Sequence, residues 1–318
     1  MQGRQKAARH LLFALRLGTA GLGVVVCSPP AAPAAAVQQN TFATPAAAVA
    51  ALVAANRAGD LRALLAILGP DAAALISSGD PIADARGRAH FVAAFDQAHK
   101  LERAGRAKMI LIVGRDRWPM PIPLVRVRSA WRFDTAAGAA AILDRRVGRD
   151  ELAVIEIFRA YVTAQREYAA LRAKAGATTE YAEHLMSTPG QQNGLYWPVK
   201  PGQEESPLGP LIADARAEGY APGAQTHPQP YYGYYFRILT RQGTYAPGGA
   251  KNYVIDSHMT NGFALLAYPA TYGDSGIMTF TVNQDGIVYQ TNFGAATTRI
   301  APQITEYDPD PRWQPSRP

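Results

Sequence analysis

The sequence contains a single cysteine, Cys27, in a chain of 318 residues. After residue 36 there is therefore no thiol to act as a nucleophile, to form a disulfide or to bind zinc as a thiolate. Charged residues are scarce at 18%, and no run after residue 36 approaches the roughly 20 apolar residues that cross a bilayer. These absences argue against cysteine enzymes, disulfide scaffolds and a membrane span in this part of the chain.

The first 36 residues have the pattern of a secretory signal peptide. Three basic residues precede an apolar run over 11–26 that only Arg16 interrupts, and small residues follow up to Ala36. We expect cleavage after Ala36 and a periplasmic or secreted protein. Two alternatives stay open: an uncleaved leader that anchors the chain in the membrane, or a lipid on Cys27, where Val26 replaces the usual small residue.

The charge of the chain is nearly balanced once this leader is set aside. Removing its four basic residues, Arg4, Lys6, Arg9 and Arg16, lowers the net charge from +7 to +3. A nucleic-acid-binding protein concentrates positive charge to neutralise phosphates. Nucleic acid is therefore not an expected partner.

Residues 37–147 are expected to form a first domain of helices followed by a small antiparallel sheet. Thr44 as a cap and Pro45 at the first helical position predict one helix that ends at Gly59, and Asp60 caps a second helix over 61–68. A third helix and three strands are expected over 85–101, 107–113, 122–128 and 130–133. Helices followed by such a meander indicate an α+β unit.

The order of these elements resembles the nuclear-transport-factor-2-like cone fold. The resemblance is carried by AVAALVAANRAGDLRALLAIL at 48–68 and by WRFD at 131–134. It implies a pocket between helices and sheet, with Trp118 and Arg132 as candidate lining residues. A tryptophan next to proline is more often a core anchor, so both interpretations of Trp118 stay open.

Residues 148–318 are expected to form a second domain, a long helix packed on an antiparallel meander. Apolar residues cover more than one face over 150–175, which predicts a helix buried on two sides, with Gly148 before its start. Short helices are expected over 179–186 and 208–218. Strands are expected over 234–240, 253–255, 263–268, 278–282 and 287–290, with a tight turn at Asp285-Gly286. The fold class of the whole chain is therefore predicted to be α+β.

The second domain resembles the globular head of type IV pilins and pseudopilins. The residues that carry this resemblance are GYYFRIL at 233–239, FALLAYPATYGDSG at 263–276 and FTVNQDGIVY at 280–289. Pilins begin with a long hydrophobic helix behind a processed terminus, whereas this chain begins with a conventional leader. Assembly into a pilus is therefore not expected.

Seven motifs extend a further resemblance over nearly the whole chain. They are LLAILGPDAAALISSGDP at 64–81, WPMPIPLV at 118–125, WRFDTAAG at 131–138, GLYWP at 194–198, SPLGPL at 206–211, GYYFRILTRQG at 233–243 and GIMTFTVNQDGIVYQ at 276–290. On these motifs the chain is identified as a member of an exported bacterial family catalogued as domain of unknown function 2950. The resemblance implies no activity, cofactor or catalytic residue.

Two patterns resemble chemical sites and are better explained otherwise. Gly273-Asp274-Ser275-Gly276 matches the nucleophile motif of chymotrypsin-like proteases, but Ile277 follows and no histidine motif is recognisable, so a turn is expected. Glu180, Glu183 and His184 share one face of the helix expected over 179–186, which we interpret as a solvated charged face. No catalytic residue, metal site or cofactor is expected.

Six aromatic residues in Gly- and Pro-rich sequence form a candidate binding surface: Tyr196, Trp197, Tyr231, Tyr232, Tyr234 and Tyr235. Aromatic rings stack on sugars, so a cell-wall glycan or an envelope protein is the expected partner, and core packing is the other interpretation.

The leading hypothesis is accordingly an exported, non-enzymatic binding or assembly module of the envelope with an exposed aromatic patch. The first alternative is an envelope hydrolase, in which Ser275 or the pair Glu204 and Glu205 meets a histidine. The second is a small-ligand binder with a cavity near Trp118.

Overall fold

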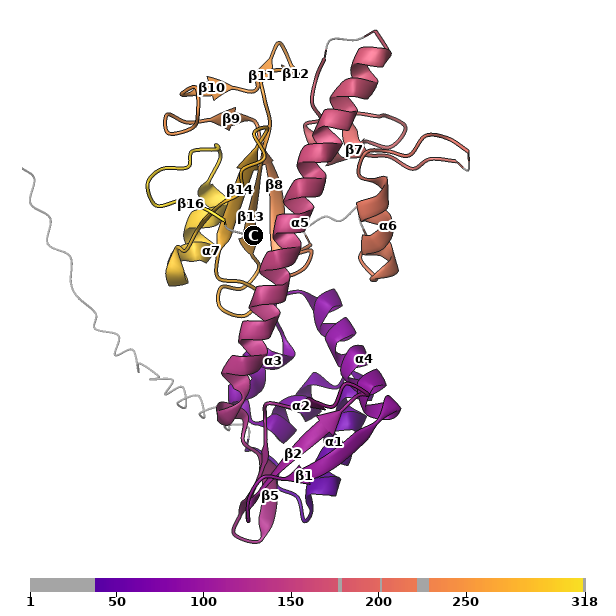
Figure 1. The fold of residues 1–318 in the computed structure, drawn as a ribbon, viewed down its shortest axis with the longest axis vertical. Helices are drawn as coiled ribbons and strands as arrows, with labels where there is room; N and C mark the ends of the chain where they lie inside the picture. Colours follow the sequence, from indigo (N-terminus) through magenta and orange to yellow (C-terminus); the bar gives the residue numbers. More distant parts are fainter. Residues whose placement is uncertain (1–37, 177–178, 201, 222–228, 317–318) are drawn as a thin grey trace, which may run out of the picture. The chain divides into compact units, whose positions relative to one another are not determined.

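The computed structural model describes residues 38–176, 179–200, 202–221 and 229–316 (Figure 1). The expected signal peptide lies outside the described residues. Within the described ranges the chain combines helices with several antiparallel sheets, which confirms the α+β class. No helix in these ranges is long and apolar enough to span a membrane.

The first two helices begin and end at their predicted cap residues. In α1 (Pro45–Ala58) the Thr44 hydroxyl accepts a hydrogen bond from Ala47 N at 3.1 Å, and Gly59 ends the helix with φ +64°. In α2 (Leu61–Leu68) the Asp60 carboxylate accepts from Ala63 N at 2.9 Å. Side chains that accept from the free N–H groups of the first turn fix where a helix starts.

The third predicted helix, over 85–101, was wrong at both ends. After η1 (Pro70–Ala72) and α3 (Ala73–Ile76), α4 spans Pro81–Gln97. It starts earlier because the Asp80 carboxylate accepts from Ile82 N and Ala83 N at 3.1 and 3.0 Å, with Pro81 in the first turn. It ends earlier because Ala98 has extended backbone angles and leads into a strand.

The first sheet is antiparallel and has the order β1-β2-β4-β5, with β3 paired to β2. Its strands are β1 (His99–Arg103), β2 (Lys108–Val113), β3 (Trp118–Pro119), β4 (Leu124–Val127) and β5 (Ala130–Phe133). Strand β5 has its predicted bounds, and β2 and β4 lie within their predicted ranges. Strands β1 and β3 were not predicted, since His99–Arg103 is mostly charged and exposed.

The long helix starts well before its predicted position. After η2 (Thr135–Ala137), α5 runs from Ala139 to Lys174 as one helix of 36 residues. Gly148, expected to precede the helix, lies inside it, because the alanine-rich start favours helix strongly enough to tolerate one glycine. Residues Val37–Pro318 form one compact unit. The predicted domain boundary at residue 147 falls inside α5, and a division of the chain there stays a prediction.

The segment after α5 was partly mispredicted. The helix expected over 179–186 is absent from its described residues: Tyr181 pairs with Met259, and β6 (His184–Met186) pairs in parallel with β7 (Gly194–Tyr196). The helix expected over 208–218 is confirmed as α6 (Gly209–Ala217).

The second sheet is antiparallel with the order β16-β15-β14-β13-β8. Its strands are β8 (Tyr234–Leu239), β13 (Ala264–Pro269), β14 (Thr279–Asn283), β15 (Tyr289–Thr291) and β16 (Gln314–Pro315). Between β8 and β13 lie β9 (Arg241–Gln242), β10 (Lys251–Asn252), β11 (Val254–Ile255) and β12 (His258–Met259). The predicted turn is present, with Gly286 at φ +80°, and η3 (Gly294–Ala296), α7 (Thr297–Ile300) and η4 (Ala301–Gln303) precede β16.

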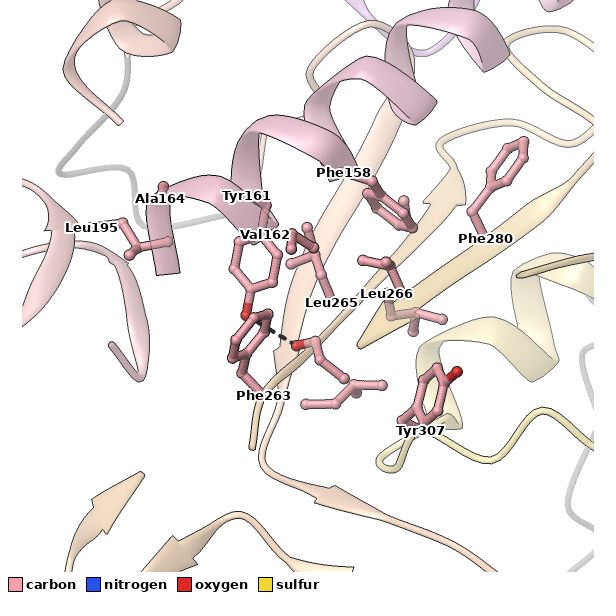
Figure 2. Close-up of a cluster of buried hydrophobic side chains, with 14 of the residues drawn as sticks. Phe158, Tyr161, Val162, Ala164, Leu195, Phe263, Leu265, Leu266, Phe280 and Tyr307 are labelled. Carbon is pink, nitrogen blue, oxygen red and sulfur yellow. Dashed lines mark hydrogen bonds between the residues drawn. The ribbon is translucent and has the colours of Figure 1, made fainter. Parts of the chain in front are cut away.

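Buried side chains gather in two clusters. The first core joins α1 and α2 to the first sheet through residues such as Leu52, Leu64 and Leu124. The second core joins α5 to the second sheet, and Figure 2 shows Phe158 and Tyr161 of α5 pointing toward strand side chains. The Tyr161 hydroxyl donates a hydrogen bond to the Ala264 carbonyl at 3.2 Å (Figure 2).

Candidate functional site

A pocket of about 560 Å³ lies against the first core and is called the first-core pocket below. Its apolar lining comes from α1 to α4, the first sheet and α5, and comprises Leu52, Leu64, Leu68, Leu75, Ile76, Phe91, Val113, Trp118, Met120, Ile122 and Ile142. Six of these side chains (Leu52, Leu64, Leu68, Val113, Met120 and Ile122) are core residues that are at most 7% exposed. The wall of the pocket is therefore part of the first core.

Several of the α4 residues that line the first-core pocket are small. The helix has no fully buried residue, and its contribution to the pocket lining includes Ala83, Gly87 and Ala94. A Cβ atom built on Gly87 would have no heavy atom within 4 Å. Interiors normally pack without voids of this size, so short side chains facing an aliphatic wall leave a recess.

Charged residues also line the first-core pocket. The guanidiniums belong to Arg88, Arg115, Arg145, Arg146 and Arg149, and the carboxylates to Asp84, Asp116 and Asp150. Arg146 donates to the Ala74 and Leu75 carbonyls at 2.8 and 2.5 Å, at the end of α3. Burial lowers the pKa of Arg146, although the group stays a cation at neutral pH.

Asp150 is the buried acid of the site, with 2% of its surface exposed. Burial raises its pKa to about 6, against the opposing effect of Arg149, which donates to Oδ1 at 3.1 and 3.0 Å. Desolvation disfavours the charged form, so this carboxyl changes protonation near neutral pH. No sequence pattern marks Asp150, because it stands in a helix rich in charged residues.

The two residues proposed for the pocket lie in different places. Trp118 lines the pocket, packs against the first core, and carries the Arg145 guanidinium over its ring at 5.6 Å. Trp118 therefore both lines a pocket and packs against the core, as the two interpretations of this residue proposed. Arg132 is exposed, donates to the Gln39 side chain at 3.2 Å and does not line the pocket. Strand alternation explains this, since its neighbour Phe133 is the buried residue.

Asp80 forms a buried polar centre beside the pocket. This centre was not among the predicted sites. Besides capping α4, its Oδ2 accepts from the Tyr220 hydroxyl at 2.8 Å and from Gly233 N at 2.9 Å. Asp80 is fully buried and thereby ties the start of α4 to residues far along the chain. The signal was the Asp-Pro pair at 80–81, a typical helix start.

The six aromatic residues of the candidate binding surface lie in separate environments. Tyr196 and Tyr234 are buried, and the other four are partly exposed. Tyr231 and Tyr232 contact each other, with ring centres 4.7 Å apart, and both contact Tyr220. The other rings have different partners: Trp197 meets Tyr168, Tyr234 meets Phe280, and Tyr235 meets Tyr268. The structure therefore does not gather the six rings into one exposed patch.

The protease-like motif forms a turn in the structure. Ser275 is fully buried, and its hydroxyl donates to the Thr271 carbonyl at 3.1 Å and accepts from Thr271 N at 3.0 Å. Glu204 and Glu205, the alternative carboxylates, are exposed. No histidine joins Ser275 in its hydrogen bonds among the described residues.

The charged residues near 180 belong to an ion-pair cluster, and the helical face expected for them was wrong. Glu180 accepts from Arg172 Nε at 2.6 Å and contacts His258 Nδ1 at 2.5 Å. His184 lies on β6 and is exposed. In the part of the chain that the structure describes, no group of three or more His, Cys, Asp or Glu residues is placed to hold a metal ion.

Comparison with known proteins gives one match. None of the curated proteins and none of the solved structures compared with the chain is similar to it, so the resemblances to the pilin head and to the cone fold are not confirmed. A family model described as "Protein of unknown function (DUF2950)" matches residues 39–316, nearly all of the chain after the expected leader. The chain therefore belongs to this family.

Proposed function

We propose that this protein is exported and binds a small molecule in the first-core pocket without catalysing a reaction. The observation that carries the proposal is the pocket, a recess of about 560 Å³ with aliphatic walls and a few charged groups. Small-molecule sites have this size and this combination of lining residues. Export is supported by the leader pattern in residues 1–36 and implies a periplasmic or secreted location.

The side chains of the pocket support binding better than catalysis. The serine in the lining, Ser78, accepts a hydrogen bond through its hydroxyl from Asp80 N at 3.3 Å. His90 also lines the pocket, but no hydrogen bond joins it to Ser78 among the described residues. A nucleophilic hydroxyl needs a base within hydrogen-bond reach, and this pair does not provide one.

A cell-wall glycan or an envelope protein is a less well supported partner. Recognition of either by the six aromatic residues would need a shared exposed surface, and of these rings Tyr231 and Tyr232 contact each other while the others pack on different partners. The first-core pocket, in contrast, is one continuous recess of about 560 Å³, which is large enough for a small molecule.

The test fills the pocket with a side chain and measures binding of a neutral apolar dye, N-phenyl-1-naphthylamine. Gly87→Phe places a ring where a Cβ has open space in the pocket lining. Gly148→Phe is the matched control, because Gly148 is also helical, also has open space around a Cβ, and does not line the pocket.

We expect Gly87→Phe to weaken dye affinity by about tenfold or more, since the ring occupies the volume that the dye needs. Gly148→Phe should bind the dye like the wild type, and circular dichroism should show both variants folded. Equal dye binding by the wild type and Gly87→Phe would reject the first-core pocket as the binding site.

A further inference from the structure

We propose that the first-core pocket takes a small amphipathic anion, with the anionic group at Arg115 and Arg145 beside Trp118. Its apolar part would lie against the aliphatic wall. This inference rests on the proposed function and adds the chemical class of the ligand. A single-chain alkyl phosphate or alkanoate, dissolved as a monomer, has this chemistry.

Positive charge exceeds negative charge in the pocket lining. Five arginines face three aspartates there, and the rest of the lining is largely apolar. A recess with low-dielectric walls and charge of one sign focuses the electric field and raises the local concentration of the opposite ion. The pocket therefore favours an anion over a neutral or cationic molecule of the same shape.

Three of the five guanidiniums are free to bind a ligand. Arg146 donates to main-chain carbonyls of α3, and Arg149 donates to Asp150. Among the described residues, Arg88, Arg115 and Arg145 take part in no ion pair and no side-chain hydrogen bond. The planar fork of a guanidinium matches the oxygens of a carboxylate or phosphate.

Arg115 and Arg145 line the pocket from two different elements. The Arg145 guanidinium lies 5.6 Å from the Trp118 ring centre. Arg115 belongs to the short turn that joins β2, ending at Val113, to β3, beginning at Trp118. Residues spaced three or four apart share one helix face, and Ile142, Arg145 and Arg149 line the pocket in this way from α5.

The negative groups of the pocket are mostly engaged. Asp84 accepts from Ser78 N at 2.9 Å, and the buried Asp150 accepts from Arg149. Asp116 is exposed and stands on the same turn as Arg115, where it offsets part of the positive charge. One free carboxylate against three free guanidiniums disfavours a cationic ligand.

The apolar wall indicates a dissolved molecule and not a membrane surface. Leu75, Ile76 and Phe91 line the pocket and are only partly exposed, so an alkyl group covers them by entering the pocket. A lipid surface would instead meet apolar side chains that stand outward. The wall and the guanidiniums together need one small molecule that carries both an apolar and an anionic part.

The experiment compares four compounds that share a ten-carbon chain, each below its micelle concentration: decyl phosphate, decanoate, decanol and decyltrimethylammonium. Affinities are measured by displacement of the neutral dye at neutral pH. Arg145→Gln removes one charge in the pocket. Arg126→Gln is the matched control, because Arg126 is exposed on β4 and does not line the pocket.

We expect decyl phosphate and decanoate to bind about tenfold more tightly than decanol, with decyltrimethylammonium the weakest. Arg145→Gln should lower affinity for the two anions by about fivefold or more, and change affinity for decanol by less than about twofold. Arg126→Gln should leave all four affinities unchanged.

The two proposals fail in different ways. If decanol binds as tightly as the anions and Arg145→Gln has no effect, while Gly87→Phe still blocks the dye, the anion inference is overturned and the proposed function stands. If Gly87→Phe does not affect any compound, the proposed function fails. A third arm uses vesicles of anionic phospholipid: sedimentation of the protein with vesicles, without binding of the monomeric anions, would overturn the inference in favour of a membrane surface.

Discussion

The two cores of this protein are built from different side chains. Of the 15 buried residues of the first core, Phe133 is the one aromatic, and the others are aliphatic or methionine. The second core has 24 buried residues, ten of which are phenylalanine, tyrosine or tryptophan. Its rings meet edge to face, as Phe158 and Phe280 do at 6.5 Å, and its tyrosine hydroxyls find carbonyl partners.

This difference in composition explains where space for a ligand can persist. Large rings with polar tips fill volume and fix their neighbours, because each hydroxyl needs a specific partner when it is buried. An aliphatic core has no such requirement, and the first-core pocket lies beside it, lined in part by small residues of α4. The first core therefore packs its own side chains closely and still has a pocket beside it.

The largest expected effect compares one aromatic residue from each core. Phe280→Ala removes a ring that is 1% exposed and should lower the free energy of unfolding by about 4 kcal/mol through lost contacts and a cavity. Phe91→Ala removes a partly exposed ring that already borders empty space, and should cost about 1 kcal/mol. Urea denaturation measures both, and equal losses would remove the distinction between a filled and an open core.

A smaller effect tests how the two cores are linked. Asp80→Ala leaves the Tyr220 hydroxyl, Gly233 N and the first turn of α4 without their acceptor, which should cost about 3 kcal/mol. Asp80→Asn, which keeps one acceptor oxygen, should lose less. Unfolding followed separately at Trp118 and Trp313, in variants with the other tryptophans replaced, should coincide in the wild-type background. If the two unfolding transitions still coincide in Asp80→Ala, contacts other than those of Asp80 couple the two cores.

The smallest of the three effects depends on pH. The pKa of Asp150 is raised to about 6 by burial, with Asp80 raising it further and Arg149 and Arg146 opposing. The folded state therefore binds this proton more tightly than the unfolded state, so stability from this group is present at low pH and is lost as pH rises from about 4 to about 6. The loss should be about 2–3 kcal/mol and should be missing in Asp150→Asn. The free energy of unfolding of the wild type and of Asp150→Asn is measured by denaturation at several pH values. The same pH dependence in both proteins between about pH 4 and about pH 6 would contradict a raised pKa for Asp150.

Local signals predicted the helix starts that side chains define. Thr44, Asp60 and the glycine after α1 all act as the sequence indicates, since a cap is a contact within a few residues. The start of α5 was mispredicted because Gly148 was interpreted as a boundary, although tertiary packing and alanine-rich sequence carry the helix through it. Strand β1 was missed because its pairing with β2, and not its composition, makes it a strand.

The candidate site was only partly predictable. Trp118 was assigned to a pocket through a resemblance, and it does line one. No sequence pattern marked the arginines on α5 or Asp150 as pocket residues. The pocket forms between elements that are distant in the sequence, so its lining is set by tertiary packing. For the six aromatic residues, closeness in sequence suggested one shared surface. Strand alternation and different packing partners separate them, except for Tyr231 and Tyr232, whose rings contact each other.

The most direct measurement follows the tryptophan indole N–H resonances by NMR while decyl phosphate is added. The protein has four tryptophans, of which Trp118 is the one in the lining of the first-core pocket. Binding in the first-core pocket should give a saturable shift of the Trp118 resonance with Trp197 and Trp313 unaffected, and this shift should be lost in Gly87→Phe. A saturable shift confined to Trp197 or Trp313, or no shift at all, would contradict binding in the first-core pocket.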